Sequence, residues 1–155
     1  MDKQNIARVI FGIAGDKLTQ AEREFFTRVN PYGYILFERN CKSPEQVKAL
    51  VAELKAISGR DNLPILIDQE GGRVARLKGS WPRFPAAGQF ASLAQKDREK
   101  AIQATYLNGR LIAHELHDLG ITVDCAPVAD VPTVGAHDVI GACKVRALRP
   151  ESAAR

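Results

Sequence analysis

The sequence has few cysteines, no long apolar run and no strong bias of charge, and each shortage excludes a class of protein. Its three cysteines, Cys41, Cys125 and Cys143, are odd in number and lack the close spacing of a metal-binding knuckle, which favours free thiols in a reducing compartment. No stretch approaches the roughly 20 apolar residues of a membrane span. The N-terminus mixes acidic and basic residues, unlike a signal peptide. We therefore expect a cytoplasmic protein with no membrane partner.

Charge is also nearly balanced. The 22 lysines and arginines exceed the 18 acidic residues by only four, and the two signs are interspersed along the chain. A nucleic-acid-binding surface needs a clustered basic stripe, so no nucleic-acid partner is expected. With 155 residues, 45% hydrophobic and 26% charged, the composition is that of one soluble globular domain.

What is present is an alternation of expected strands and helices. Apolar runs rich in β-branched residues predict strands at 7–15, 33–38 and 63–67, and a fourth from Ile121. Cap residues and helical spacing predict helices from Thr19 to about Val29, from Ser43 to Gly59, and from about Asp97 to Leu119, with a long loop before the last. The apolar strands suggest cover on both faces, and the alternation predicts a parallel α/β sheet.

Two architectures fit this order. One is a complete open doubly wound sheet. The other is the first half, about four βα units, of a TIM-type (β/α)8 barrel, which typically needs about 250 residues. Half a barrel would leave two strand edges unpaired.

In both architectures, functional groups gather at the carboxyl ends of the strands. The densest group follows the third strand, in LPILIDQEGGRVARLKG (63–79), where Asp68 and Arg76 could form a rim for a hydroxyl-rich ligand. Equally, Asp68 could pair with Arg73 and merely hold the loop. Further polar residues end the second and fourth strands: Glu38, Arg39, Asn40, Asp124 and Asp130.

Other candidate residues give weaker signals of function. His114 and His117 are spaced one residue too closely for the zinc-protease helix motif, and a solvated helix end is favoured. His137-Asp138 could be a base and its orienter, although a turn is favoured. Cys125 is expected to be a small buried residue. Neither a Gly-x-Ser-x-Gly elbow nor a standard phosphate-binding loop is present in the sequence.

Several motifs together resemble one family. IDQEGGRVARL, GYILFERN with SPEQVKALVAEL, WPRFPAA, ITVDCAPVADV and AHDVIG are similar to the N-terminal part of glycoside hydrolase family three. The branch they resemble most is that of the bacterial cytoplasmic β-N-acetylglucosaminidases, or β-hexosaminidases, of cell-wall recycling. The resemblance runs from about residue 8 to Gly141.

The resemblance implies a TIM-type barrel that removes a terminal β-linked N-acetylglucosamine with retention of configuration. It implies a small carbohydrate substrate, N-acetylglucosaminyl-anhydromuramic acid and its peptides, and no cofactor or metal. It places sugar-binding roles at Asp68 and Arg76. The chain, 1–155, would then be the N-terminal half of the catalytic barrel.

The sequence also departs from the family pattern. A retaining glycosidase needs a nucleophile and an acid/base group, and the resemblance places this Asp and His beyond Arg155, so no catalytic residue is assigned. Residues 142–155 do not follow the pattern: Cys143 stands where a sugar-binding Arg is expected, and Arg146 could replace it only after an insertion. An interrupted gene or a reading-frame error would explain this.

Three hypotheses follow from these departures. The chain is a β-N-acetylhexosaminidase fragment that is inactive alone, a sugar-binding half-barrel without catalysis, or a standalone open α/β domain.

Overall fold

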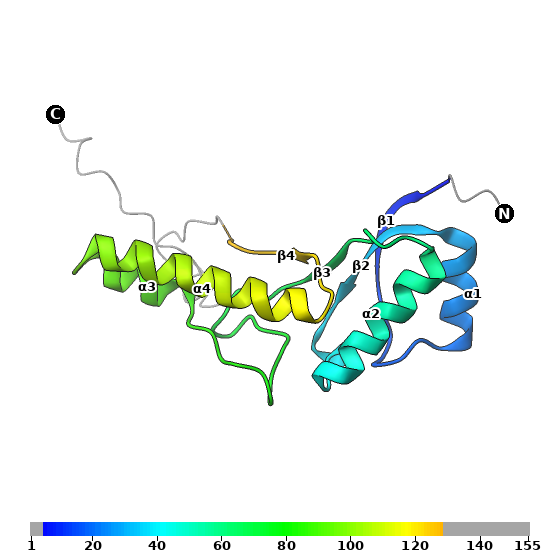
Figure 1. The fold of residues 1–155 in the computed structure, drawn as a ribbon, viewed down its shortest axis with the longest axis horizontal. Coiled ribbons are helices and arrows are strands. Elements are labelled where there is room, and N and C mark those ends of the chain that lie inside the picture. The colour runs from blue at the N-terminus through cyan, green and yellow to red at the C-terminus, as the bar shows by residue number, and fades with distance from the viewer. Residues whose placement is uncertain (1–4, 129–155) are drawn as a thin grey trace, which may run out of the picture.

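A computed structural model describes residues 5–128. Its sheet has four parallel strands in the order β1-β2-β3-β4 (Figure 1). The strands are β1 (Ala7–Gly12), β2 (Pro31–Leu36), β3 (Ile65–Ile67) and β4 (Val123–Asp124). The helices are α1 (Gln20–Val29), α2 (Pro44–Ser58), α3 (Ala87–Ala94) and α4 (Arg98–Asp118), and a 3-10 turn, η1, covers Glu38–Asn40.

The strand order decides between the two expected architectures. In a doubly wound sheet the order reverses at a switch point, whereas here each strand pairs with its neighbour in sequence. Right-handed crossovers between such strands place successive helices on one face of the sheet, as in a barrel. Figure 1 shows α1 and α2 side by side on the same side of the strands. The arrangement is that of a partial TIM-type barrel.

The predicted helix starts are confirmed by their caps. The Thr19 side chain accepts a hydrogen bond from the Glu22 backbone N–H, and the Glu22 carboxylate accepts one from the Thr19 N–H, which completes a capping box. The Ser43 side chain accepts a hydrogen bond from the Gln46 backbone N–H and so caps α2, with Pro44 at the first helical position. Gly59 ends α2 at φ 63°, a left-handed conformation that glycine adopts without strain.

Two features of the fold differ from the sequence prediction. The segment 87–94 forms helix α3, where only a loop was expected, because its start has no side-chain cap and carries an early glycine. The strand bounds also differ: β1 ends at Gly12 rather than at residue 15, β3 covers only Ile65–Ile67, and β2 keeps its predicted length but lies two residues earlier, at Pro31–Leu36.

The core lies between the sheet and the helices. Tyr34, Leu36, Ile65 and Ile67 are fully buried, and Tyr34 meets the ring of Phe26 from α1 edge-on at a centroid distance of 4.9 Å. Residues from α2 and from the carboxyl-terminal half of α4 complete it: Val47, Leu50, Val51, Leu54, Ile112 and Leu116. The sheet is therefore anchored to its helices most firmly at its two central strands.

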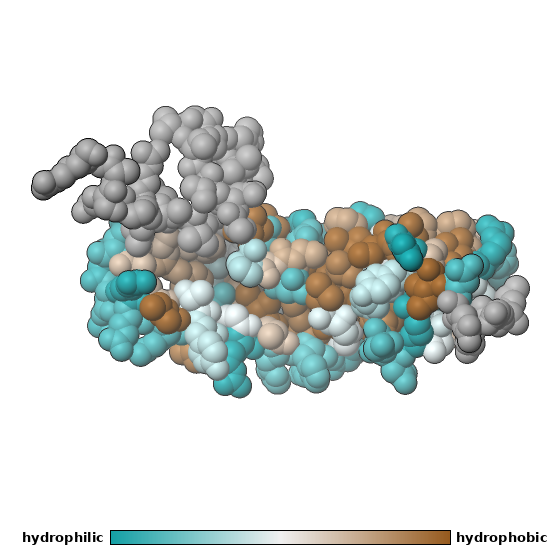
Figure 2. All heavy atoms as spheres, turned by 90° about the horizontal axis from the view of Figure 1, so that it is seen from above, coloured by the Kyte–Doolittle hydropathy of each residue, from teal (hydrophilic) through white to brown (hydrophobic). Residues whose placement is uncertain are grey.

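The outer strands are not covered on both faces as the apolar pattern suggested. Val9 and Ile10 in β1 are 41% and 44% exposed, and Val123 in β4 is 40% exposed. Apolar surface is visible in brown from above in Figure 2. The prediction was wrong for β1 and β4, the edge strands of this sheet, because the elements among residues 5–128 leave these side chains open to solvent. Among these residues no helix is both long and apolar enough to cross a bilayer.

Candidate functional site

The carboxyl ends of β2, β3 and β4 meet at one edge of the sheet, which we call the rim. β3 ends at Ile67, which lies opposite Asp124 in the register with β4. Asp68 therefore follows the strand directly at this edge. The parallel register is what brings two carboxylates together from positions 56 residues apart in the sequence.

Asp68 and Arg76 form an ion pair at the rim. The Arg76 Nη2 donates to Asp68 Oδ2 at 2.7 Å, and the two side chains are 27% and 23% exposed. The alternative in which Asp68 pairs with Arg73 is wrong, because Arg73 is exposed and Asp68 pairs with Arg76. The Nε of Arg76 has no hydrogen-bond partner among residues 5–128. The pair combines acceptors and donors that remain partly accessible, as a ligand rich in hydroxyl groups requires.

The two glycines of the motif let the chain turn back so that Arg76 can reach Asp68. Gly71 and Gly72 have φ values of 88° and 61°, which disfavour other residues. A Cβ on Gly71 would lie 2.3 Å from the carbonyl oxygen of Pro85, and one on Gly72 would lie 2.5 Å from the Cβ of Ala86. The turn is thus packed against the segment that leads into α3.

Asp124 and Cys125 also lie at the rim. Burial raises the pKa of the Asp124 carboxyl, and the nearby charge of Asp68 raises it further. Burial also raises the pKa of the Cys125 thiol, and Asp68 beside it acts in the same direction. Cys125 is half-buried at the rim rather than a core residue as predicted. A raised pKa makes this thiol a poor nucleophile.

The polar residues after β2 hold loops together. Asn40 is fully buried; its Nδ2 donates to the carbonyl oxygens of Ile13 at 3.0 Å and Gly15 at 2.6 Å, and its Oδ1 accepts from the Phe37 N–H at 2.8 Å. The Arg39 Nε donates to the same Ile13 oxygen at 3.0 Å. These residues fix the loop after β1 against the end of β2.

Glu38, in contrast, lies at the surface and links two loops of the rim. Its Oε2 accepts a hydrogen bond from Lys78 Nζ at 2.7 Å, and both side chains are more than half exposed. That hydrogen bond lowers the pKa of Glu38, and a small desolvation effect opposes it. An exposed pair of this kind contributes little to stability.

The histidines of α4 lie on a solvated helix surface, as expected. His114 and His117 are 71% and 91% exposed, each 3.9 Å from a carboxylate oxygen of Asp118. No group of three metal-ligating side chains occurs between residues 5 and 128. The described residues therefore offer no preformed metal site.

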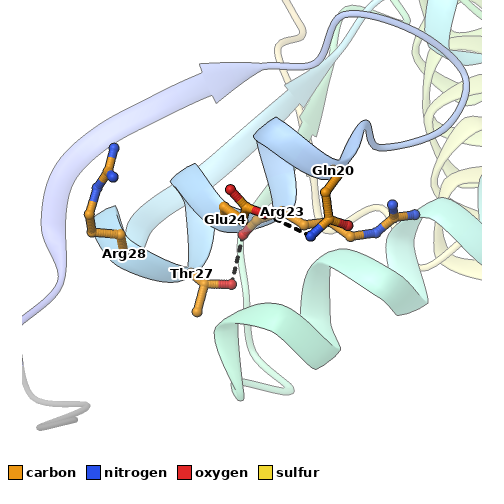
Figure 3. Close-up of a pocket in the computed structure, with 5 residues that line it drawn as sticks. All are labelled: Gln20, Arg23, Glu24, Thr27 and Arg28. Carbon is orange, nitrogen blue, oxygen red and sulfur yellow. Dashed lines mark hydrogen bonds between the residues drawn. The ribbon is translucent and has the colours of Figure 1, made fainter.

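A surface hollow on α1 lies apart from the rim. Its lining comes from one helix only (Figure 3): Gln20, Arg23, Glu24, Thr27 and Arg28. Gln20 donates to Glu24, and Thr27 donates to the carbonyl oxygen of Arg23, so its polar groups partly satisfy one another. No element of the rim contributes to it, and we assign it no function.

Five sequence candidates lie outside the described residues. They are Asp130, His137, Asp138, Cys143 and Arg146. The departure of residues 142–155 from the family pattern falls there as well.

Sequence reasoning gave no role to the two most deeply buried polar residues, Asn40 and Gln69. They are 0% and 1% exposed, and apart from the hydroxyl-bearing ring of Tyr34 they are the buried polar side chains among residues 5–128. Gln69 comes two residues after the end of β3, and Asn40 ends the short turn that follows β2, each among charged neighbours. An amide within a charged cluster at a strand end was the available signal, since amides tolerate burial better than charges do.

Comparison with known proteins gives a family match over most of the chain. The model of the glycosyl hydrolase family 3 N terminal domain matches residues 4–142. A β-hexosaminidase of Methylococcus capsulatus is 38% identical over 132 residues, which are 85% of this chain and 38% of that protein. A β-hexosaminidase of Alkalilimnicola ehrlichii is 38% identical over 133 residues, again 38% of its length.

Solved structures agree with the fold. The crystal structure of NagZ from Neisseria gonorrhoeae in complex with N-trifluoroacetyl-D-glucosamine has a TM-score of 0.75 and 38% identity, covering 81% of this chain and 38% of that one. A family 3 β-N-acetylglucosaminidase from Paenibacillus has a TM-score of 0.69 and 33% identity, covering 83% and 23%. The chain thus spans well under half the length of these relatives.

Proposed function

Because the chain belongs to glycosyl hydrolase family 3, we propose that its rim is the N-acetylglucosamine-binding part of a β-N-acetylhexosaminidase. The observation that carries this proposal is the Asp68–Arg76 pair at the carboxyl end of β3. An ionised carboxylate accepts from two neighbouring hydroxyls, and a guanidinium donates to sugar oxygens from a planar fork. The N-acetylglucosamine analogue bound by the Neisseria relative supports a sugar of this class.

A more specific proposal names the substrate and the cellular compartment. The substrates proposed are N-acetylglucosaminyl-anhydromuramic acid and its peptides, processed in the cytoplasm during peptidoglycan recycling. The resemblance of the strand-three motif to enzymes of that pathway supports this. A terminal sugar held at the rim would leave the rest of such a substrate outside it.

We propose further that these 155 residues bind the sugar without cleaving it. A retaining glycosidase needs two groups flanking the scissile bond, about 5 Å apart when both are carboxyls. The resemblance assigns neither group to this chain, and Asp68 is engaged with Arg76 instead. A chromogenic N-acetylglucosaminide is the test, with no turnover expected; clear turnover that Asp68→Ala abolishes would contradict this proposal.

Sugar binding itself is tested by nuclear magnetic resonance (NMR) titration of the labelled chain with N-acetylglucosamine. Saturable shifts are expected at Asp68 and Arg76 at millimolar sugar. Asp68→Asn should weaken binding about tenfold, because a hydrogen bond to a charged group contributes about 1.5 kcal/mol or more. Arg73→Gln, in the same motif but outside the pair, is the matched control. Unchanged spectra of the wild-type chain at millimolar sugar would refute the binding role.

A further inference from the structure

Gln69 lies between the two residues proposed to hold the sugar, and its side chain points into the protein. It is 1% exposed, although it directly follows Asp68 at the rim. Its Oε1 accepts two hydrogen bonds from consecutive backbone N–H groups, from Arg76 at 2.9 Å and from Leu77 at 3.2 Å. One buried carbonyl thus fixes the backbone that carries the arginine.

The backbone of Gln69 is held in turn by the neighbouring strand. Its N–H donates to Asp124 Oδ1 at 3.0 Å, and the Cys125 N–H donates to the carbonyl oxygen of Ile67 at 2.8 Å. The end of β3 and the end of β4 are therefore tied together on both sides of Asp68. This leaves the carboxylate little freedom to move relative to the sheet.

We infer that Gln69 is a positioning residue for sugar binding, which sets the Arg76 guanidinium against Asp68 through the backbone of residues 76–77. The inference rests on the proposed function of the rim. Arg76 follows Asp68 by eight positions, and the turn between them is secured by a bridge from Gly71 to Val74. Without the Gln69 carbonyl, the return segment keeps that turn but loses the contact that fixes its end beside the strand.

The electrostatic setting explains why an amide occupies this position. A carboxylate could accept the same two hydrogen bonds, but it would place a third negative charge beside Asp68 and the half-buried Asp124. Like charges and burial both disfavour the ionised form. Glu70 also lies in this motif and adds to the negative field felt by Cys125. The neutral amide supplies the acceptor without that repulsion.

The experiment compares Gln69→Met, Gln69→Glu and the matched exposed control Gln103→Met in the full chain, each checked for folding by circular dichroism. Hydrogen exchange of the Arg76 and Leu77 amides reports the contact directly. In Gln69→Met both amides should exchange at least tenfold faster, while the amides of buried α2 stay protected. The dissociation constant for N-acetylglucosamine should rise roughly tenfold or more, because a small misplacement of a binding group is costly.

Gln69→Glu gives a readout that loss of packing would not. Its protonated carboxyl keeps the acceptor without an added charge, whereas its ionised form is repelled by Asp68 and Asp124. Exchange protection and sugar affinity should therefore approach wild-type values near about pH 5 and fall by about pH 8. The wild-type chain at the same pH values is the reference. Gln69→Met should show weak sugar affinity and low exchange protection at both pH values.

Three results would decide against the inference. Folded Gln69→Met with wild-type protection at Arg76 and Leu77 would overturn it, as would lost protection with unchanged sugar affinity. A Gln69→Glu variant that is as poorly protected and as weak in sugar affinity as Gln69→Met near about pH 5 would also overturn it, because its protonated carboxyl keeps the acceptor. If the wild-type chain binds no sugar, the proposed function fails instead; exchange at the two amides, together with the Arg76 guanidinium signals, then decides the positioning role alone.

Discussion

Asn40 offers the sharpest test of how the rim is built. It is fully buried and makes three hydrogen bonds from its side chain, to Ile13, Gly15 and Phe37. Replacing Asn40 with Ala removes all three. The Ile13 oxygen keeps its bond from Arg39, whereas Gly15 O and Phe37 N lose the side-chain partner. At about 1 kcal/mol for each bond, and more where a group is left unsatisfied, we expect a loss of about 3 kcal/mol in the free energy of unfolding.

The charge variant Asn40→Asp sharpens this test. Its carboxylate keeps the acceptor for the Phe37 N–H but sets negative oxygen against the carbonyls of Ile13 and Gly15. Burial and these carbonyls should raise the pKa of the new carboxyl above its unfolded value. Its contribution to stability is then fully present below the unfolded pKa, about 3.9, and is lost as pH rises through the folded pKa. Asn40→Asp should therefore be more destabilised at neutral pH than near about pH 4.

The assay is urea denaturation followed by circular dichroism at both pH values, with exposed Asn62→Ala as the control. Asn62 is solvent-exposed, so its replacement should change stability by no more than about 0.5 kcal/mol. A loss of less than about 1 kcal/mol for Asn40→Ala would refute the reasoning. So would an Asn40→Asp deficit, measured against wild type, that is the same at both pH values.

Three further predictions concern other parts of the fold. Gly33→Ala should lower the free energy of unfolding by about 2 kcal/mol or more, because its Cβ would lie 2.5 Å from the carbonyl oxygen of Pro64. Gly109→Ala, in the middle of α4 with nothing within 4 Å, should raise it by about 0.5–1 kcal/mol. Thermal denaturation compares the two variants. Thr19→Ala should lose about 1 kcal/mol of unfolding free energy in urea, because it removes the cap of α1, and an unchanged midpoint would contradict that. Burial raises the pKa of Asp124 above its ordinary value of 3.8, so its contribution to stability falls as pH rises through the pKa of the folded state. Asp124→Asn should flatten this fall. Identical profiles of stability against pH for the variant and the wild type, measured by denaturation, would contradict the prediction.

Local sequence signals were sufficient for most elements. Thr19 and Ser43, each followed three residues later by Glu or Gln, predicted the starts of α1 and α2, and the caps form as expected. Such signals act between residues close in sequence, so they can be read without the fold. Helix α3 was missed because its start at Ala86 carries no side-chain cap.

The candidate site was only partly predictable. Asp68 and Arg76 were identified from the sequence, but physical reasoning could not decide whether Arg73 or Arg76 pairs with Asp68. The turn at Gly71 and Gly72, packed against residues 84–86, decides that in favour of Arg76. Their sugar-binding roles remain predictions.

The sequence by itself determined the parallel α/β class, the helix caps and the position of a polar motif at the end of β3, because each depends on short-range patterns. The tertiary structure decided the order of the strands and the meeting of Asp68 with Asp124 and Arg76. It also decided the burial of Gln69 and Asn40, whose amides each hold segments that are distant in sequence. These depend on register and on the path of the chain between strands, which no local pattern specifies.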